Sequence, residues 1–195
     1  MVKFFDTILG KTKPIKANLD QLFALPSAAI TLEVSANLKS TGRAAVCFKP
    51  ASGSAFANTS VEFEEILKTL HKDDADPNAT HVTQETDSFG YRWVVLSDDG
   101  LEELVTETHM INRSLEDHGF SPQLLCSVFS FVDTTDQTKV YWIYLYKQGT
   151  FYPFVPQANE RRDNERELSL KSVVGQDLPV EPDLSRWFPI WEIPV

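Results

Sequence analysis

The sequence predicts an α+β fold in which a largely antiparallel sheet is covered by helices. Strand-like runs occur in groups joined by short turn segments, which favours antiparallel pairing. Segments with apolar residues at helical spacing separate these groups. One run, residues 140–146, is apolar or aromatic throughout, as in a central strand covered on both faces. The predicted order is helix, two strands, helix, two strands, helix, three strands, helix and a C-terminal tail.

Length and composition fit a single domain over residues 1–195. Apolar residues make up 42% of the chain and charged residues 24%, an ordinary globular balance. A chain of this length buries roughly 70% of the surface that its unfolded form exposes. We therefore expect a hydrophobic core that needs no disulfide or metal.

The N-terminal segment, residues 1–16, is predicted to be amphipathic, with apolar residues on one helical face followed by three lysines. This pattern is typical of a membrane interface. It also suits docking on the protein's own core, which we favour because nine residues form only a marginal isolated helix. The membrane-interface candidates are Phe4, Phe5, Ile8 and Leu9.

The first elements are short. We predict a helix over residues 18–25 that Pro26 ends, and strands over 28–34 and 43–48. The stretch 40–42 (Ser-Thr-Gly) is predicted to be the turn between these strands.

Two further helices follow, separated by a strand pair. A capping box predicts a helix over residues 59–70, and the hairpin strands are predicted at 80–86 and 91–96. The clearest helical pattern starts at Asp98 or Asp99 and ends before Gly119. Its apolar face consists of Leu101, Leu104, Val105, Thr108, Ile111 and Leu115.

The second half of the chain is predicted to contain three strands, a charged helix and a tail. The strands are expected at residues 124–132, 139–146 and 151–154, and the helix at 160–173. Residues 176–195 are rich in proline and tryptophan, so they cannot form a regular helix and are predicted to wrap the domain as a tail.

The formal net charge is −10, which disfavours binding to the phosphate backbone of nucleic acids. Such a charge favours encounter with a basic partner, although solubility alone accounts for it as well. The N-terminus lacks the pattern of a signal peptide, and no run reaches the ~18 apolar residues of a membrane span. We expect a cytoplasmic protein with at most peripheral contact at the inner face of the membrane.

The sequence contains no familiar catalytic constellation. The metal, hydrolase and nucleotide motifs HExxH, GxSxG, GxGxxG and GxxxxGK do not occur. Cys47 and Cys126 stand in apolar runs and are predicted to be buried hydrophobes; a disulfide between them stays open but is disfavoured. We expect no enzyme activity, cofactor or metal. The alternative is an unfamiliar site in which Arg43, Glu107 and His109 converge in a pocket.

Two aromatic blocks, residues 150–156 and 183–191, are the unusual feature of this sequence. Trp, Tyr and Arg dominate the energetics of protein interfaces. The alternative is that the tail inserts its tryptophans into the core. The protein-binding candidates are Phe151, Tyr152, Phe154, Arg186, Trp187, Phe188 and Trp191.

Several runs resemble the PspA-associated protein family PspAB of actinobacteria and archaea. They are spread along the chain and comprise residues 22–29 (LFALPSAA), 41–48 (TGRAAVCF), 119–127 (GFSPQLLCS), 145–154 (LYKQGTFYPF), 160–164 (ERRDN) and 178–189 (LPVEPDLSRWFP). The resemblance implies a role beside PspA-like proteins, which are coiled-coil, membrane-binding proteins of the envelope stress (phage shock) response. A small family, PspAA, often accompanies them. The resemblance transfers no catalytic residue.

We therefore expect a non-catalytic adaptor or regulator that binds a PspA-like protein, with PspAA as a further candidate partner. The alternative is a protein-binding module like the small secretion chaperones, which also combine antiparallel sheets with flanking helices.

Overall fold

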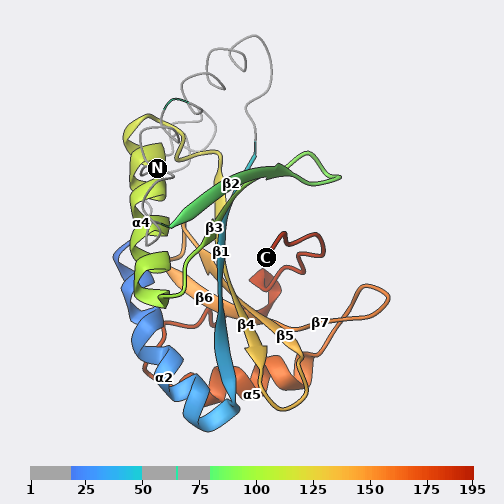
Figure 1. The fold of residues 1–195 in the computed structure, drawn as a ribbon. Coiled ribbons are helices and arrows are strands. Elements are labelled where there is room, and N and C mark those ends of the chain that lie inside the picture. The colour runs from blue at the N-terminus through green and yellow to red at the C-terminus, as the bar shows by residue number, and fades with distance from the viewer. Residues whose placement is uncertain (1–18, 50–64, 66–79) are drawn as a thin grey trace, which may run out of the picture.

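The computed structural model describes residues 19–49, 65 and 80–195, and its centre is an antiparallel sheet with helices on one face (Figure 1). The sheet has six strands in the order β2-β3-β1-β4-β5-β6. Every neighbouring pair is antiparallel, which confirms the predicted α+β class. The strands are β1 (Leu38–Phe48), β2 (His81–Thr86), β3 (Arg92–Ser97), β4 (Leu124–Asp133), β5 (Lys139–Leu145) and β6 (Thr150–Phe154).

The helices α2 and α4 lie on one face of the sheet, and α5 packs beside α2 (Figure 1). A short hairpin of β7 and β8 connects β6 to α5. The helical elements are a 3₁₀ turn η1 (Asp20–Ala24), α2 (Leu25–Ala36), α4 (Leu101–Asp117), α5 (Asn164–Val174) and a second 3₁₀ turn η2 (Leu184–Arg186), and the hairpin strands are β7 (Pro156–Gln157) and β8 (Arg161–Arg162).

The sheet has a hydrophobic core on each face. The larger core packs the helices against side chains such as Phe129 and Trp142. The smaller core lies on the opposite face and includes Trp93, Ile143 and, from the tail, Trp187. Both faces of β5 are covered, which fits its run of apolar and aromatic residues from Val140 to Leu145.

The position of β5 differs from the prediction. Its two faces are covered, as expected, and its central residues are buried. However, it lies next to the edge strand β6, while β1 and β4 occupy the centre of the sheet. The continuous apolar run of β5 therefore indicated that both faces of the strand are covered. It did not indicate how far the strand lies from the edge of the sheet.

The prediction of a strand over residues 28–34 is wrong, because these residues belong to α2. Pro26 does not end a helix; it lies at the start of α2, where its missing N–H costs no hydrogen bond. The helix buries Ala28 and Leu32 but exposes Ile30 and Val34. With apolar residues on both its inner and outer faces, it shows little of the amphipathic contrast that marks a surface helix.

The turn predicted at residues 40–42 is instead an irregularity within the long strand β1. The register with β4 shifts between Ser40 and Ala44. Gly42 has a φ of 72° there, and its carbonyl accepts a 3.0 Å hydrogen bond from the amide of Asp98. A Cβ at Gly42 would lie 2.7 Å from the Asp98 carbonyl oxygen. The glycine thus allows the loop before α4 to cross β1 closely.

The other predicted strands and helices that fall within the described residues broadly match the observed elements. β2 and β3 form the expected hairpin. α4 buries the predicted apolar face, except that Leu101 is only partly buried, and it also buries Asn112, which was not predicted. α5 starts at Asn164, four residues later than predicted, because Asp163 caps it by accepting a hydrogen bond from the amide of Arg166.

Two predicted elements lie outside the described residues. They are the N-terminal amphipathic segment, with Phe4, Phe5, Ile8 and Leu9, and the helix over 59–70, of which Glu65 alone is described. Among the helices that the structure does describe, none combines the length and the apolar character needed to cross a bilayer.

Candidate functional site

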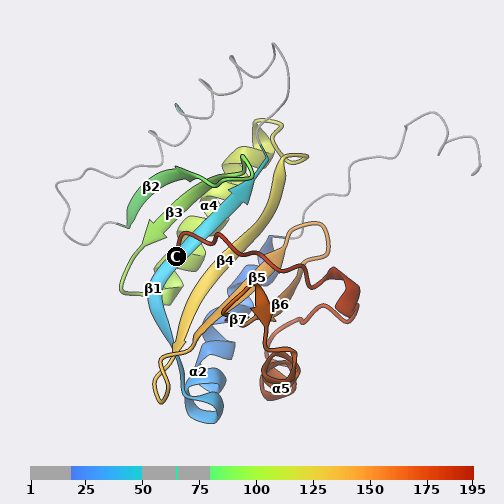
Figure 2. The ribbon, with the colours of Figure 1, turned by 90° about the vertical axis from the view of Figure 1, so that its right-hand side faces the viewer.

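The C-terminal tail crosses the sheet on the face opposite α2 and α4 (Figure 2). It has no regular structure after η2 and is held by side chains of the sheet that donate to its carbonyls. The hydroxyl of Tyr152 donates to Phe188 at 2.8 Å, and that of Tyr141 donates to Val195 at 2.8 Å. The guanidinium of Arg43 donates to the carbonyl of Pro194 at 2.9 Å.

Trp187 anchors the start of this crossing. Its indole N–H donates to the carbonyl of Glu181 at 3.0 Å, and its ring stacks on Tyr152 with centroids 6.1 Å apart. The ammonium of Lys171 lies 5.8 Å from the ring centroid, and Arg162 donates to the Trp187 carbonyl. The part of the tail that crosses the sheet therefore starts from a buried, hydrogen-bonded residue.

The turn of the β2–β3 hairpin meets the tail from the other side. Asp87 organises this turn, because its carboxylate accepts hydrogen bonds from the amides of Phe89 and Tyr91 and from the indole of Trp93. Ser88 then binds the carboxylate of Glu192 through its amide at 2.8 Å and its hydroxyl at 2.6 Å. These bonds tie the hairpin turn to the tail.

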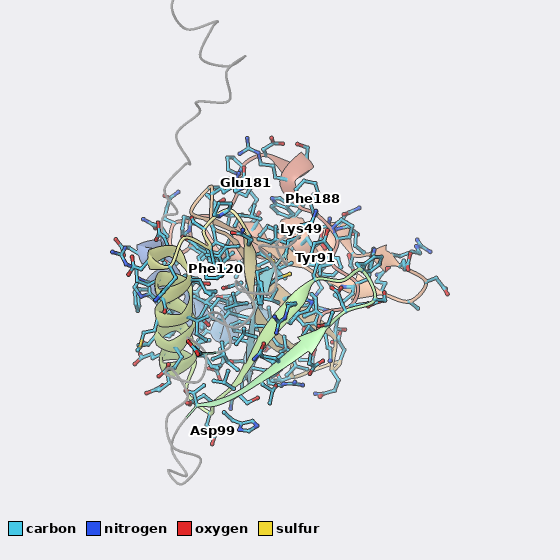
Figure 3. The ribbon with its side chains drawn as sticks, turned by 90° about the horizontal axis from the view of Figure 1, so that it is seen from above. Lys49, Tyr91, Asp99, Phe120, Glu181 and Phe188 are labelled. Atoms are coloured by element: carbon cyan, nitrogen blue, oxygen red, sulfur yellow. The ribbon has the colours of Figure 1, made fainter. Side chains whose placement is uncertain are left out.

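A groove with a cavity of about 460 Å³ opens between the hairpin turn, the tail and the sheet. Tyr91 of the hairpin and Phe188 of the tail, both labelled in Figure 3, line it from two different segments. We call this the aromatic groove; it is lined by Cys47, Asp87, Phe89, Tyr91, Trp93, Leu125, Cys126, Leu145, Tyr152, Phe188, Pro189, Ile190, Trp191 and Glu192.

An irregularity in β4 helps to open the groove. Cys47 of β1 faces Cys126, whereas Phe48 faces Leu124, so Leu125 has no partner across the ladder. Such a bulge bends a strand and redirects its side chains. Leu125 is accordingly 38% exposed in a strand whose other residues, apart from Val132, are buried, and it reaches the groove.

The groove is lined by two thiols and two carboxylates, besides the polar groups of its tyrosines and tryptophans. The carboxylates of Asp87 and Glu192 already bind groups of the hairpin turn. The interaction with the Cys126 thiol, together with burial, raises the pKa of the Cys47 thiol far above its ordinary value. Burial likewise raises the pKa of Tyr152 well above that of free tyrosine. The groove therefore offers neutral and apolar surface along its floor.

A family model described as PspAB, PspA associated protein B, matches residues 2–195. The chain belongs to this family. The match confirms the resemblance found in the sequence and extends over nearly its whole length. No curated protein and no solved structure matches the chain.

The structure brings three of the predicted binding residues of this PspAB-family chain to the groove: Tyr152, Phe188 and Trp191. Phe188 is 59% exposed, whereas the Tyr152 side chain forms part of the wall and is almost fully buried. Trp191 is half-buried against the ring of Phe154, 5.3 Å away.

Three other candidates are buried, so their prediction as surface contacts is corrected. Phe151 lies in the helix-side core, and Phe154 and Trp187 lie in the tail-side core. Both faces of β6 are covered, which the aromatic composition of the segment did not reveal. Arg186 is exposed, but it pairs with Glu181 and Asp183 and does not line the groove.

The alternative site of Arg43, Glu107 and His109 does not assemble. Arg43 points to the tail, on one face of the sheet. Glu107 and His109 belong to α4 on the other face, where His109 packs against Phe23 with ring centroids 5.0 Å apart. The sheet separates these groups, so they cannot act on one substrate.

Sequence reasoning missed the hairpin residues Phe89 and Tyr91 and the bulge residue Leu125. Phe89 is 66% exposed, and its position beside the tail follows only from long-range packing. The one available signal was an aromatic residue within a turn segment, since turns otherwise favour small and polar residues.

Proposed function

We propose that this PspAB-family chain is a non-catalytic adaptor that binds a PspA-like, coiled-coil protein of the membrane stress response through the aromatic groove. The observation that carries the proposal is the gathering of exposed apolar side chains at one cavity. Phe89, Phe188 and Leu125 are 66%, 59% and 38% exposed, and all three line it. Exposed apolar surface concentrated around a groove is typical of interaction sites.

Family membership supports the identity of the partner, since the family is described by its association with PspA. The net charge of this chain supports a partner segment that carries basic residues. The net charge of −10 favours a segment whose apolar side chains are flanked by basic residues. In this proposal the partner's apolar side chains enter the groove, and its basic flanks lie near the carboxylates of Asp87 and Glu192.

Binding measured by titration calorimetry with the PspA-like protein of the same organism tests the proposal. The groove variant combines Phe89→Ser with Phe188→Ala, which removes two exposed rings from opposite walls. We expect its affinity to fall at least about tenfold, because aromatic anchors dominate interface energies. Val34→Ser is the matched control, since Val34 is a 79% exposed apolar residue on α2, across the sheet from the groove.

The outcomes separate this proposal from the others. Equal affinity of the wild type and the groove variant, or a loss confined to Val34→Ser, contradicts binding through the groove. The chaperone-like alternative instead predicts that unrelated extended apolar peptides bind as tightly as the PspA-like protein. That result would replace the adaptor function by general binding of apolar segments.

A further inference from the structure

Two thiols face each other on the floor of the aromatic groove. Cys47 and Cys126 are direct partners in the β1–β4 register, in the middle of the sheet. Both belong to the tail-side core, so their side chains point to the same face. Both are free thiols, and both line the cavity although only 4% and 5% of their surface is exposed.

The geometry of such a pair is close to that of a disulfide. Directly opposite residues in antiparallel strands have Cβ atoms about 4.5–5.5 Å apart. A disulfide joins Cβ atoms about 3.5–4.5 Å apart, with Cα atoms about 4.4–6.8 Å apart. The adjoining β4 bulge at Leu125 allows local adjustment, because the ladder is already interrupted beside the pair.

We propose that Cys47 and Cys126 form a reversible intramolecular disulfide, and that a small peroxide entering the aromatic groove is the oxidant. One thiolate attacks a peroxide oxygen, so its sulfur is oxidised to a sulfenic acid and the peroxide is reduced to water. The second thiol then attacks that sulfur and displaces the hydroxyl group as a second water. The sum is two thiols and hydrogen peroxide giving one disulfide and two waters, and a dithiol reductant restores the thiols by exchange.

The surroundings of the pair favour this neutral product. The floor is apolar, and the carboxylates of Asp87 and Glu192 lie in the same groove. A disulfide places no charge on this floor, whereas a monovalent soft metal ion held by two thiolates would leave one net negative charge there. The raised pKa of Cys47 makes the reactive thiolate scarce near neutral pH. Oxidation should therefore be slow there and accelerate in mildly alkaline buffer.

The test uses the full-length chain, reduced and then treated with hydrogen peroxide, and needs no partner protein. We expect intact mass to show the loss of two hydrogen atoms, thiol titration to show the loss of both thiols, and peptide mapping to link Cys47 to Cys126. Dithiothreitol should reverse all three changes. Cys47→Ser and Cys126→Ser should each lose the intramolecular link and give sulfenic acid or higher oxides instead.

Because the wild-type chain carries the main measurement, the test does not depend on how well the serine variants fold. The proposal is overturned if both thiols survive peroxide in alkaline buffer while the denatured chain is oxidised. It is also overturned if the products are only intermolecular dimers or sulfonic acids. Trp93 gives a second signal, since it pairs with Cys47 across β1 and β3, and a disulfide at that position should quench its fluorescence reversibly.

Discussion

At the scale of single residues, Trp187 and Phe188 are neighbours in sequence with opposite environments. Trp187 is 6% exposed and packs on Tyr152, whereas Phe188 is 59% exposed at the groove. Composition alone marked both as interface candidates, because aromatic residues are enriched in cores and in interfaces alike. Which of the two enters the core depends on where the tail crosses the sheet, and no local pattern encodes that.

Trp187→Ala is expected to lower the free energy of unfolding by about 3–5 kcal/mol, since it leaves a large cavity in the tail-side core. Phe188→Ala should change stability by only about 0.5 kcal/mol, because its ring is mostly in water. Urea unfolding of both variants measures this difference. Equal stability of the two variants would contradict the assigned position of Trp187.

Arg162 joins three parts of the tail-side region. Its guanidinium binds the buried carboxylate of Glu167 at 2.8 Å, donates to the carbonyl of Trp187 and lies 5.3 Å from the ring centroid of Phe154. Burial raises the pKa of Glu167 although the hydrogen bonds from Arg162 and the Val155 amide act against this shift. The carboxylate is therefore costly to ionise and depends on its arginine.

Arg162→Met should destabilise the chain by about 3–5 kcal/mol near neutral pH, because the buried carboxylate then has no counter-charge. The folded-state pKa of Glu167 lies above its unfolded value, so falling pH protonates the folded carboxyl first. The penalty should accordingly shrink as pH falls toward about 5. The control is Arg113→Met, because the Arg113 guanidinium is half-exposed and pairs with the exposed Asp117 and, at 3.9 Å, with the partly buried Glu116. This change should cost about 1 kcal/mol or less. Urea unfolding at both pH values tests this; a penalty independent of pH would argue against an uncompensated Glu167.

At the scale of elements, local pattern predicted most strands and α4 but not α2. α4 has a clear apolar stripe, and its burial follows that stripe from Leu104 to Leu115. α2 contains β-branched residues such as Ile30 and Val34, which have a high propensity for strands. These two side chains are also exposed, so they do not mark a buried helical face. Packing against β1 and α5 overrides that preference.

Gly42→Ala tests the close crossing of β1 by the loop before α4. An added methyl group would meet the Asp98 carbonyl at 2.7 Å in a backbone conformation with positive φ. We expect a loss of about 1–3 kcal/mol from strain and displacement of the loop. Gly90→Ala is the matched control, because its φ is 81° but no atom lies within 4 Å of the added Cβ. It should lose less stability in thermal unfolding; equal losses would mean that the close approach contributes nothing.

At the scale of the whole molecule, the aromatic groove combines segments that are far apart in the chain. The two thiols, the hairpin turn around Tyr91 and the tail around Phe188 come together only through the order of the sheet. The sequence predicted the α+β class. It also named Tyr152, Phe188 and Trp191 as protein-binding candidates, a role that stays a prediction, and the structure places these three residues at the groove. The sequence could not predict the wall formed by the hairpin turn, because packing between distant segments leaves no periodic pattern in the residues of that turn.

The central claim is that a PspA-like partner occupies this groove, and hydrogen–deuterium exchange of the purified complex tests it most directly. We predict slower amide exchange on binding in residues 87–91 of the hairpin turn and 187–192 of the tail, with no change in α2 over Leu25–Ala36. A stable complex that protects α2 and leaves the hairpin turn and tail unchanged would contradict the account.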